Sequence, residues 1–274
     1  MPVELGVHRM MFRPRESHDL KLLSTSLKIT PEPTALRWLH DVFDNSIAIA
    51  EFGGSTSELR FESVVTLQHF ETTLPDYPLE EYANTYPFRY SDEDFPNLER
   101  ALARHYPGDR VRDWALQFLD AADTTGTMKL LRSMTLGIKD QFNYMRRSQK
   151  GVQCPDETLL SRSGSCRDFA VLMMEATRAL GLAARFVSGY IFAPGNKSTV
   201  TGGGSTHAWM QVYLPGAGWI DFDPTNSIVG NRNLIRVAVA WSPHLVLPLW
   251  GTYEGAANSF LGMDVTVNVT EEIG

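Results

Sequence analysis

One of the two cysteines in this 274-residue chain has neighbours suited to a reactive thiol. Cys166 follows Ser165, which can cap a helix that begins at the cysteine. Unpaired N–H groups and the positive end of the helix dipole favour an anion at that point, so the thiolate is favoured there. The backbone N–H of Cys166 is then also placed to stabilise an oxyanion. Cys154 precedes Pro155 in a polar stretch and is interpreted as a buried, inert thiol.

A thiol nucleophile needs a base, and His207 is the best candidate among seven histidines. It begins the strand-like run 207–214 after a glycine-rich segment, 202–204, which we interpret as a flexible rim beside the base. The glycines lack the Lys-Ser/Thr pair and the following helix of a phosphate-binding loop. We therefore expect His207 to take the thiol proton.

The base in turn needs a group that orients it, and the run 218–225 supplies two carboxylates on one face of a strand. Asp221 and Asp223 would lie ~6.5–7 Å apart along the strand, so only one of them is expected to reach the imidazole. The strand pattern alone does not choose between them.

The register of the hairpin between the histidine strand and the aspartate strand gives a structural test. If Leu214 pairs with Trp219, His207 and Asp223 fall on opposite faces, whereas a three-residue connection or a bulge returns them to one face. We predict such an offset, which would bring Asp223 near Trp209 and diagonal to His207.

The rest of the sequence predicts the elements that must hold these side chains. Strands are expected at 20–29, 36–43, 46–52 and 59–70, with a two-residue hairpin turn at Asp44-Asn45. Apolar residues at helical spacing predict helices over 92–105, 111–121, 128–147 and 166–180, the last ending at Gly181. A polar loop is expected over 151–164, and further strands at 184–192, 207–214, 218–222 and in the tail 234–269, whose end alternates at Val265, Val267 and Val269.

Composition narrows the class of protein. The net charge of −7 and the scattered basic residues are unlike a nucleic-acid-binding surface. The sequence contains no run of ~18 apolar residues, so we predict no membrane span. The N-terminal residues do not form a signal peptide. We therefore expect a cytoplasmic protein with a reduced thiol. Neither zinc-ligand nor calcium-loop spacing occurs, so we expect no metal and no cofactor.

Four ordered motifs resemble the transglutaminase-like superfamily, in particular its bacterial members described as cysteine peptidases. They are GSCRDFA at 164–170, RALGLAARFVSGY at 178–190, HAW at 207–209 and GWIDFDPT at 218–225. The resemblance implies an α+β fold with a papain-like core and a triad of Cys166, His207 and Asp223. It chooses the aspartate before Pro224, and it implies acyl-thioester chemistry on an amide.

The expected organisation is an N-terminal antiparallel β domain over 1–75, a catalytic domain over 76–232 and C-terminal strands over 233–274. We expect hydrolysis of a peptide or carboxamide bond in a protein or peptide substrate, with protein-glutamine transamidation as the alternative. A binding or scaffold protein that keeps the fold without turnover is the rival from another class.

Three further residues are candidates for the oxyanion site or the cleft: Tyr144, Gln141 and Trp209. Residues 240–244 depart from the family pattern near the cleft, and we expect His244 at the surface.

Overall fold

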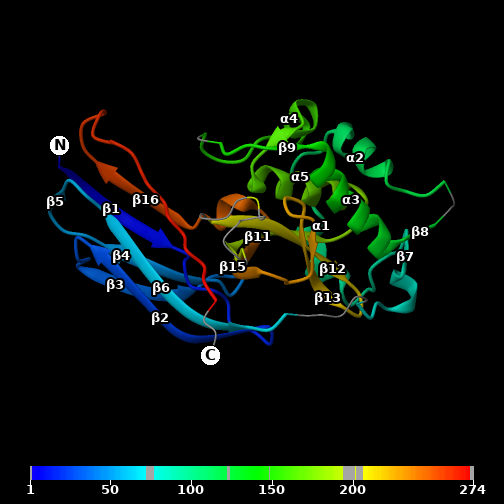
Figure 1. Cartoon of the computed structure of the whole chain (residues 1–274), viewed down its shortest axis with the longest axis horizontal. Coiled ribbons are helices and arrows are strands. Elements are labelled where there is room, and N and C mark those ends of the chain that lie inside the picture. Colours follow the sequence, from blue (N-terminus) through cyan, green and yellow to red (C-terminus); the bar gives the residue numbers. More distant parts are fainter. Residues whose placement is uncertain are drawn as a thin grey trace.

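The structure is a computed structural model that describes residues 2–71, 77–121, 124–147, 149–193, 201 and 206–271. Strands of the N-terminal region gather at one end of the molecule, and the helices and a second sheet occupy the other end (Figure 1). The combination of helices with antiparallel sheets confirms the α+β class.

The N-terminal region is a sheet in which a strand from late in the chain takes part. The strand order is β16-β1-β4-β3, and the short β5 also pairs with β1. The bounds are β1 Val3–Met10, β3 Ala35–His40, β4 Ser46–Glu51, β5 Ser55–Thr56 and β16 Leu249–Glu254. A long ribbon of β2 (Leu20–Thr30) and β6 (Arg60–His69) packs against the sheet through Ile29, which meets Met10, Ala48 and Ala50 in a small apolar core.

The second region is built on a five-stranded antiparallel sheet with the order β14-β13-β12-β11-β15. Its strands are β11 Ala184–Ile191, β12 His207–Leu214, β13 Gly218–Asp223, β14 Ile228–Val229 and β15 Leu234–Ala240. Successive side chains of β12 point to opposite faces of this sheet. Ala208, Met210 and Val212 join the main apolar core, while Trp209 belongs to a separate cluster on the other face.

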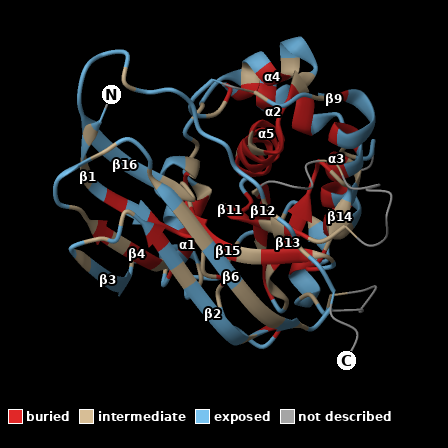
Figure 2. Cartoon of the chain, turned by 60° about the vertical axis from the view of Figure 1, so that its left-hand side comes forward, coloured by how far each residue is buried: buried red, intermediate tan, exposed pale blue. Residues whose placement is uncertain are grey.

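Helix α5 (Cys166–Ala179) is the centre of the main core, and nearly all of it is buried (Figure 2). It packs on β12 and β11 and is covered by α2 Asp109–Leu116, α3 Thr127–Gln141 and α4 Pro155–Ser161, while α1 Phe95–Leu102 packs against β11. Gly181 adopts a left-handed backbone with φ +78°, and the N–H of Leu182 bonds back to the Thr177 carbonyl, so α5 ends as predicted. In the described residues, no helix has the length and apolar character needed to cross a bilayer.

Short elements complete the chain: 3-10 turns at Glu81–Ala83 and Pro243–Leu245, and the paired bridges β7 (Thr85–Tyr86) with β8 (Thr125–Gly126) and β9 (Asn143–Tyr144) with β10 (Ser163–Gly164). The predicted glycine-rich rim at 202–204 lies outside the described residues.

The N-terminal region is fixed to β15 of the central sheet through specific polar contacts. The Asn45 side chain donates to the Val239 carbonyl at 2.8 Å and accepts from the Val239 N–H at 2.9 Å, as a paired strand would. The N–H of Arg15 donates to the carbonyl of Arg236 at 2.9 Å. Because Asn45 is fully buried, loss of these bonds would leave unpaired polar groups in the interface.

The hairpin near residue 44 differs from its prediction. β3 and β4 pair through His40 and Ser46, so the connection has five residues, 41–45, and is not a two-residue turn. The Asp41 side chain accepts from the N–H groups of both Phe43 and Asn45, each at 2.9 Å, and this Asx-type turn uses the residues that the sequence pattern assigned to the strand.

Two helix boundaries and the end of the tail also differ from prediction. α3 ends at Gln141, because Phe142 turns to an extended backbone and residues 143–144 pair with β10. The expected loop 151–164 contains α4, which starts at Pro155, a favoured first position of a helix. The alternating valines near the end form no strand in the structure, and Val265 is 54% exposed. Alternation predicts a strand only where a partner edge is present.

Candidate active site

The candidate nucleophile, Cys166, is the first residue of α5, and a buried network holds the start of that helix in place. The carboxylate of Asp168 accepts from the N–H and the hydroxyl of Ser165, both at 2.8 Å. Its other oxygen accepts from the Gln153 N–H at 2.7 Å and from the Arg147 guanidinium at 2.8 Å. Asp168 has no exposed surface and Cys166 has 7%, so the thiol lies at a fixed helix N-terminus with restricted access.

The candidate base, His207, is the first residue of β12 and forms a fully buried pair with Asp223 of β13. Nε2 of the imidazole donates to the Asp223 carboxylate at 2.8 Å. The same carboxylate also accepts from the Asn226 amide and the Thr225 N–H, each at 2.9 Å. Burial alone would raise the pKa of Asp223, but the His207 charge and these hydrogen bonds outweigh it and hold the pKa below its ordinary value.

The charge of Asp223 determines the protonation of the imidazole. Burial opposes a charge on His207, but the charge and hydrogen bond of Asp223, with smaller contributions from Cys166, together outweigh burial and raise the pKa of His207 to about 10. The second ring nitrogen, Nδ1, is buried and has no hydrogen-bond partner of ordinary geometry among the described residues. Cys166 contributes to this raised pKa, so the thiol lies near the imidazole, and Nδ1 is the ring nitrogen that Asp223 leaves for an exchange of a proton with sulfur.

The strand register confirms the predicted offset. Leu214 pairs with Gly218 and Tyr213 with Trp219, so the connection is the three residues 215–217. Continued along the strands, this register sets Asp223 opposite Trp209 and diagonal to His207, on one face of the sheet. Gly216 and Gly218 both have positive φ, which glycine adopts without strain.

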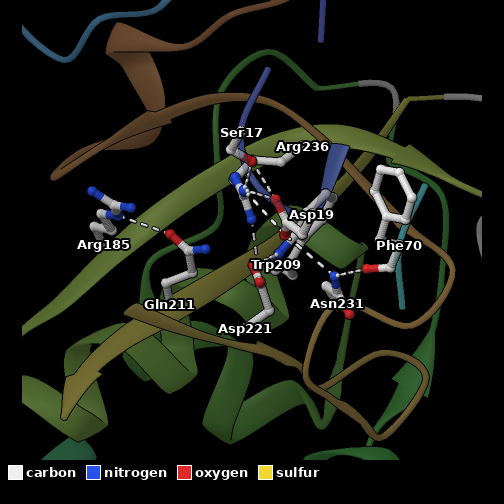
Figure 3. Close-up of polar contacts among 9 residues, drawn as sticks. All are labelled: Ser17, Asp19, Phe70, Arg185, Trp209, Gln211, Asp221, Asn231 and Arg236. Atoms are coloured by element: carbon white, nitrogen blue, oxygen red, sulfur yellow. Dashed lines mark hydrogen bonds and ion pairs between the residues drawn. The ribbon is translucent and has the colours of Figure 1, made fainter. Parts of the chain in front are cut away.

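The two aspartates of β13 have different hydrogen-bond partners. Asp223 bonds to His207, whereas Asp221 accepts the indole N–H of Trp209 at 2.6 Å and lies 3.5 Å from the Arg236 guanidinium (Figure 3). Burial raises the pKa of Asp221, and Arg236 offsets this only in part. The geometry thus brings Asp223, and not Asp221, to the imidazole.

Two family profiles match this chain, and one of them includes the candidate site. The profile of the transglutaminase-like superfamily matches residues 113–224, which contain all three candidate triad residues. The profile of the bacterial transglutaminase-like N-terminal region matches residues 1–68. Residues 113–224 belong to the transglutaminase-like superfamily.

Relatives of this transglutaminase-like chain differ in how much of it they share. An uncharacterised protein of Mycobacterium tuberculosis is 36% identical over 169 residues, which cover 59% of this chain and 52% of the relative. The chain thus spans about half the length of that curated relative. A protein-glutamine gamma-glutamyltransferase of Pseudomonas aeruginosa is 33% identical over 111 residues, covering 37% of this chain and 17% of the relative.

A solved structure shares its fold with most of the chain. A candidate cysteine protease from Cytophaga hutchinsonii superposes with a TM-score of 0.67 at 18% identity, covering 92% of this chain and 82% of that one. At this identity the likeness concerns the fold, and it extends through both the N-terminal sheet and the central sheet.

The remaining predicted residues of the transglutaminase-like site lie at different places. Tyr144, in β9, pairs with Gly164, two residues before Cys166. The charge of the Cys166 thiol acts on the Tyr144 phenol. Burial first, and then that thiol, raises the pKa of Tyr144, so the phenol is a hydrogen-bond donor at neutral pH. Gln141 is exposed and accepts from Arg162 at 2.8 Å, which turns it to the surface. His244 is exposed, as expected, and bonds to Ser242.

Trp209, the third candidate for the cleft, is fully buried and stacks on the imidazole of His207. Cys154 is exposed at the start of α4, so the prediction of a buried thiol there was wrong. No group of three or more His, Cys, Asp or Glu side chains in the described ranges is arranged to hold a metal ion.

Sequence reasoning missed Asp168 and Asn226. The signal for Asp168 was present, because Ser165 and Asp168 have the spacing of a capping box, in which the fourth residue bonds back to the cap. For Asn226 no local pattern exists, since it reaches Asp223 only through the turn after β13.

Proposed function

We propose that the protein is a cysteine hydrolase that cleaves a peptide or carboxamide bond through an acyl-thioester of Cys166. The observation that carries this proposal is the buried His207–Asp223 pair, 2.8 Å long, whose second imidazole nitrogen has no other partner among the described residues and lies near a thiol at a helix N-terminus. This arrangement supports the roles of nucleophile for Cys166, base for His207 and orienting group for Asp223, which thiol catalysis requires.

The proposed reaction has two steps. His207 holds the thiol proton, and the Cys166 sulfur forms a bond to the substrate carbonyl carbon. The oxyanion accepts from the Cys166 N–H, and the Tyr144 hydroxyl is the proposed second donor. His207 then protonates the leaving nitrogen as the C–N bond breaks. Water attacks the thioester, His207 takes its proton and returns it to sulfur, and the carboxylic acid departs.

The same thioester permits transfer to an amine, and one comparison favours this second function. The Pseudomonas relative with a transferase name is 33% identical to this chain over 111 residues. Hydrolysis remains the preferred proposal, and it rests on the resemblance to cysteine peptidases described from the sequence.

The first experiment tests whether Cys166 is an activated thiol. Iodoacetamide labelling near pH 7 is measured by mass spectrometry in a Cys154→Ser background, because Cys154 is exposed and would react independently. The proposal expects His207→Ala to slow labelling at Cys166 by about tenfold or more, since the base contributes roughly 10²–10⁴-fold to proton transfer. Equal, slow labelling of both proteins would support a scaffold without turnover.

The second experiment separates hydrolysis from transfer. A peptide library containing glutamine is incubated with the Cys154→Ser protein, with and without a primary amine, and products are identified by mass. New termini or released ammonia without amine incorporation support hydrolysis. Amine adducts at glutamine that appear in place of hydrolysis would support the transferase.

A further inference from the structure

The imidazole of His207 is held on its face as well as at its edge. Asp223 fixes Nε2, and the ring of Trp209 stacks on the imidazole with centroids 5.9 Å apart and planes 26° apart. A hydrogen bond to one nitrogen still allows the ring to rock about that bond. A fully buried indole against the face limits this motion, so the orientation of Trp209 determines where Nδ1 points.

The orientation of Trp209 has two visible causes. Its indole N–H donates to Asp221 at 2.6 Å. On the neighbouring strand, Gly189 leaves the space that the ring occupies: a Cβ atom there would lie 2.7 Å from the indole and 2.2 Å from the Ile235 carbonyl oxygen. Space and hydrogen bond together therefore select one rotamer of Trp209.

Asp221 is in turn held by a chain of contacts that reaches the N-terminal region. Its second oxygen lies 3.5 Å from Nη1 of Arg236, whose Nη2 donates to Asp19 at 2.9 Å (Figure 3). Asp19 begins the approach to β2 and also accepts from Asn231 at 3.2 Å. Burial opposes the charge of Asp19, but Arg236 and neighbouring donors keep its pKa below the ordinary value, so Asp19 is ionised at neutral pH.

We propose that Asp221 is a positioning residue for the catalytic base, acting through Trp209, and that Arg236 and Asp19 connect this device to the N-terminal region. The idea rests on the proposed function insofar as His207 is the base. It assigns a role to the aspartate that does not touch the imidazole, and it makes the N-terminal region a support of the active site as well as a neighbour of it.

The test is a double-mutant cycle read by the iodoacetamide labelling rate of Cys166, which needs no substrate. Trp209→Phe keeps an aromatic ring but removes the N–H, and Asp221→Ala removes its acceptor. Each is expected to slow labelling by about tenfold in the Cys154→Ser background, and the double variant to be no slower than either single one, since both remove one interaction. Independent effects, close to 100-fold in the double variant, would overturn the proposal.

Trp114→Phe is the matched control, because Trp114 is also a buried tryptophan but its indole N–H has no hydrogen-bond partner in the described residues. It should leave labelling within about twofold. Asp221→Asn covers the case in which Asp221→Ala does not fold: its amide oxygen can still accept from Trp209, so labelling should stay within about threefold of the parent.

The proposal would also be overturned if Asp221→Asn or Trp114→Phe slowed labelling as much as Trp209→Phe does. If His207→Ala itself fails to slow labelling, the proposed function fails. If His207→Ala slows labelling and Trp209→Phe does not, only the positioning role fails.

Discussion

Replacing Asp223 with Asn should bring the titration of His207 into the neutral range. The imidazole pKa of about 10, against an ordinary 6.5, corresponds to about 5 kcal/mol in favour of the charged ring. Two unit charges 2.8 Å apart attract by about 6 kcal/mol at an effective dielectric constant of about 20. The attraction of Asp223 is thus of the right size, and its hydrogen bond and Cys166 add to it against the cost of burial. In Asp223→Asn the amide oxygen would still accept from Nε2 but carry no charge, leaving the effect of burial largely unopposed.

The assay is the NMR titration of the His207 Cε1 proton in histidine-labelled protein, assigned with His207→Gln. In the parent protein the resonance should not titrate between pH 5 and 9. In Asp223→Asn the midpoint of the His207 titration should lie at least ~2 pH units below that of the parent protein. Labelling of Cys166 at pH 7 should fall as well, because a less basic imidazole holds the thiol proton less well. An unchanged His207 midpoint in a folded variant would refute the electrostatic reasoning.

The raised pKa has a consequence for stability with a defined sign. A folded-state pKa above the unfolded value means that the charged His207 stabilises the native protein fully below pH ~6.5. That contribution is lost as the pH rises towards about 10. Urea denaturation of the parent protein and Asp223→Asn should therefore differ most near pH 6 and converge at alkaline pH, and a constant difference would contradict the assignment.

Three further predictions concern neighbouring residues. Tyr144→Phe should lower kcat by about 10²-fold, as expected for loss of an oxyanion donor, with labelling of Cys166 within about twofold; an unchanged kcat would remove Tyr144 from the mechanism. Asp168→Ala should destabilise the protein by about 3–5 kcal/mol in urea denaturation, since it leaves Arg147 and several donors unpaired, and a loss under about 1 kcal/mol would contradict the network. Gly189→Ala should cost about 1–3 kcal/mol and slow labelling of Cys166 by displacing Trp209, whereas wild-type values for both would show that the space is not required.

The strands that carry His207 and Asp223 could be predicted from the sequence because their information is local. The hairpin register followed from the requirement that His207 and Asp223 share a face, and from glycines that permit a three-residue connection. The start of α5 followed from Ser165 and the end from Gly181. Each of these features depends on a few adjacent residues whose backbone preferences agree.

Other features depended on contacts between distant parts of the chain. α3 was predicted to continue to residue 147, but its last expected turn instead pairs with residues 163–164. The choice between Asp221 and Asp223 needed the positions of Trp209 and Arg236, which no spacing along the strand contains. The boundaries of the three predicted domains stay a prediction. The predicted C-terminal segment is itself divided, because β15 joins the central sheet while β16 joins the N-terminal sheet.

The return of β16 to β1 affects how the protein is made. β1 lies between β4 and β16, so one side of the first strand has no full-length partner until residues 249–254 have been synthesised. During translation that side is an open strand edge, which other chains can pair with. A chain cut after the central sheet would keep Cys166, His207 and Asp223 but expose this edge, and we expect it to aggregate even though its active-site residues are complete.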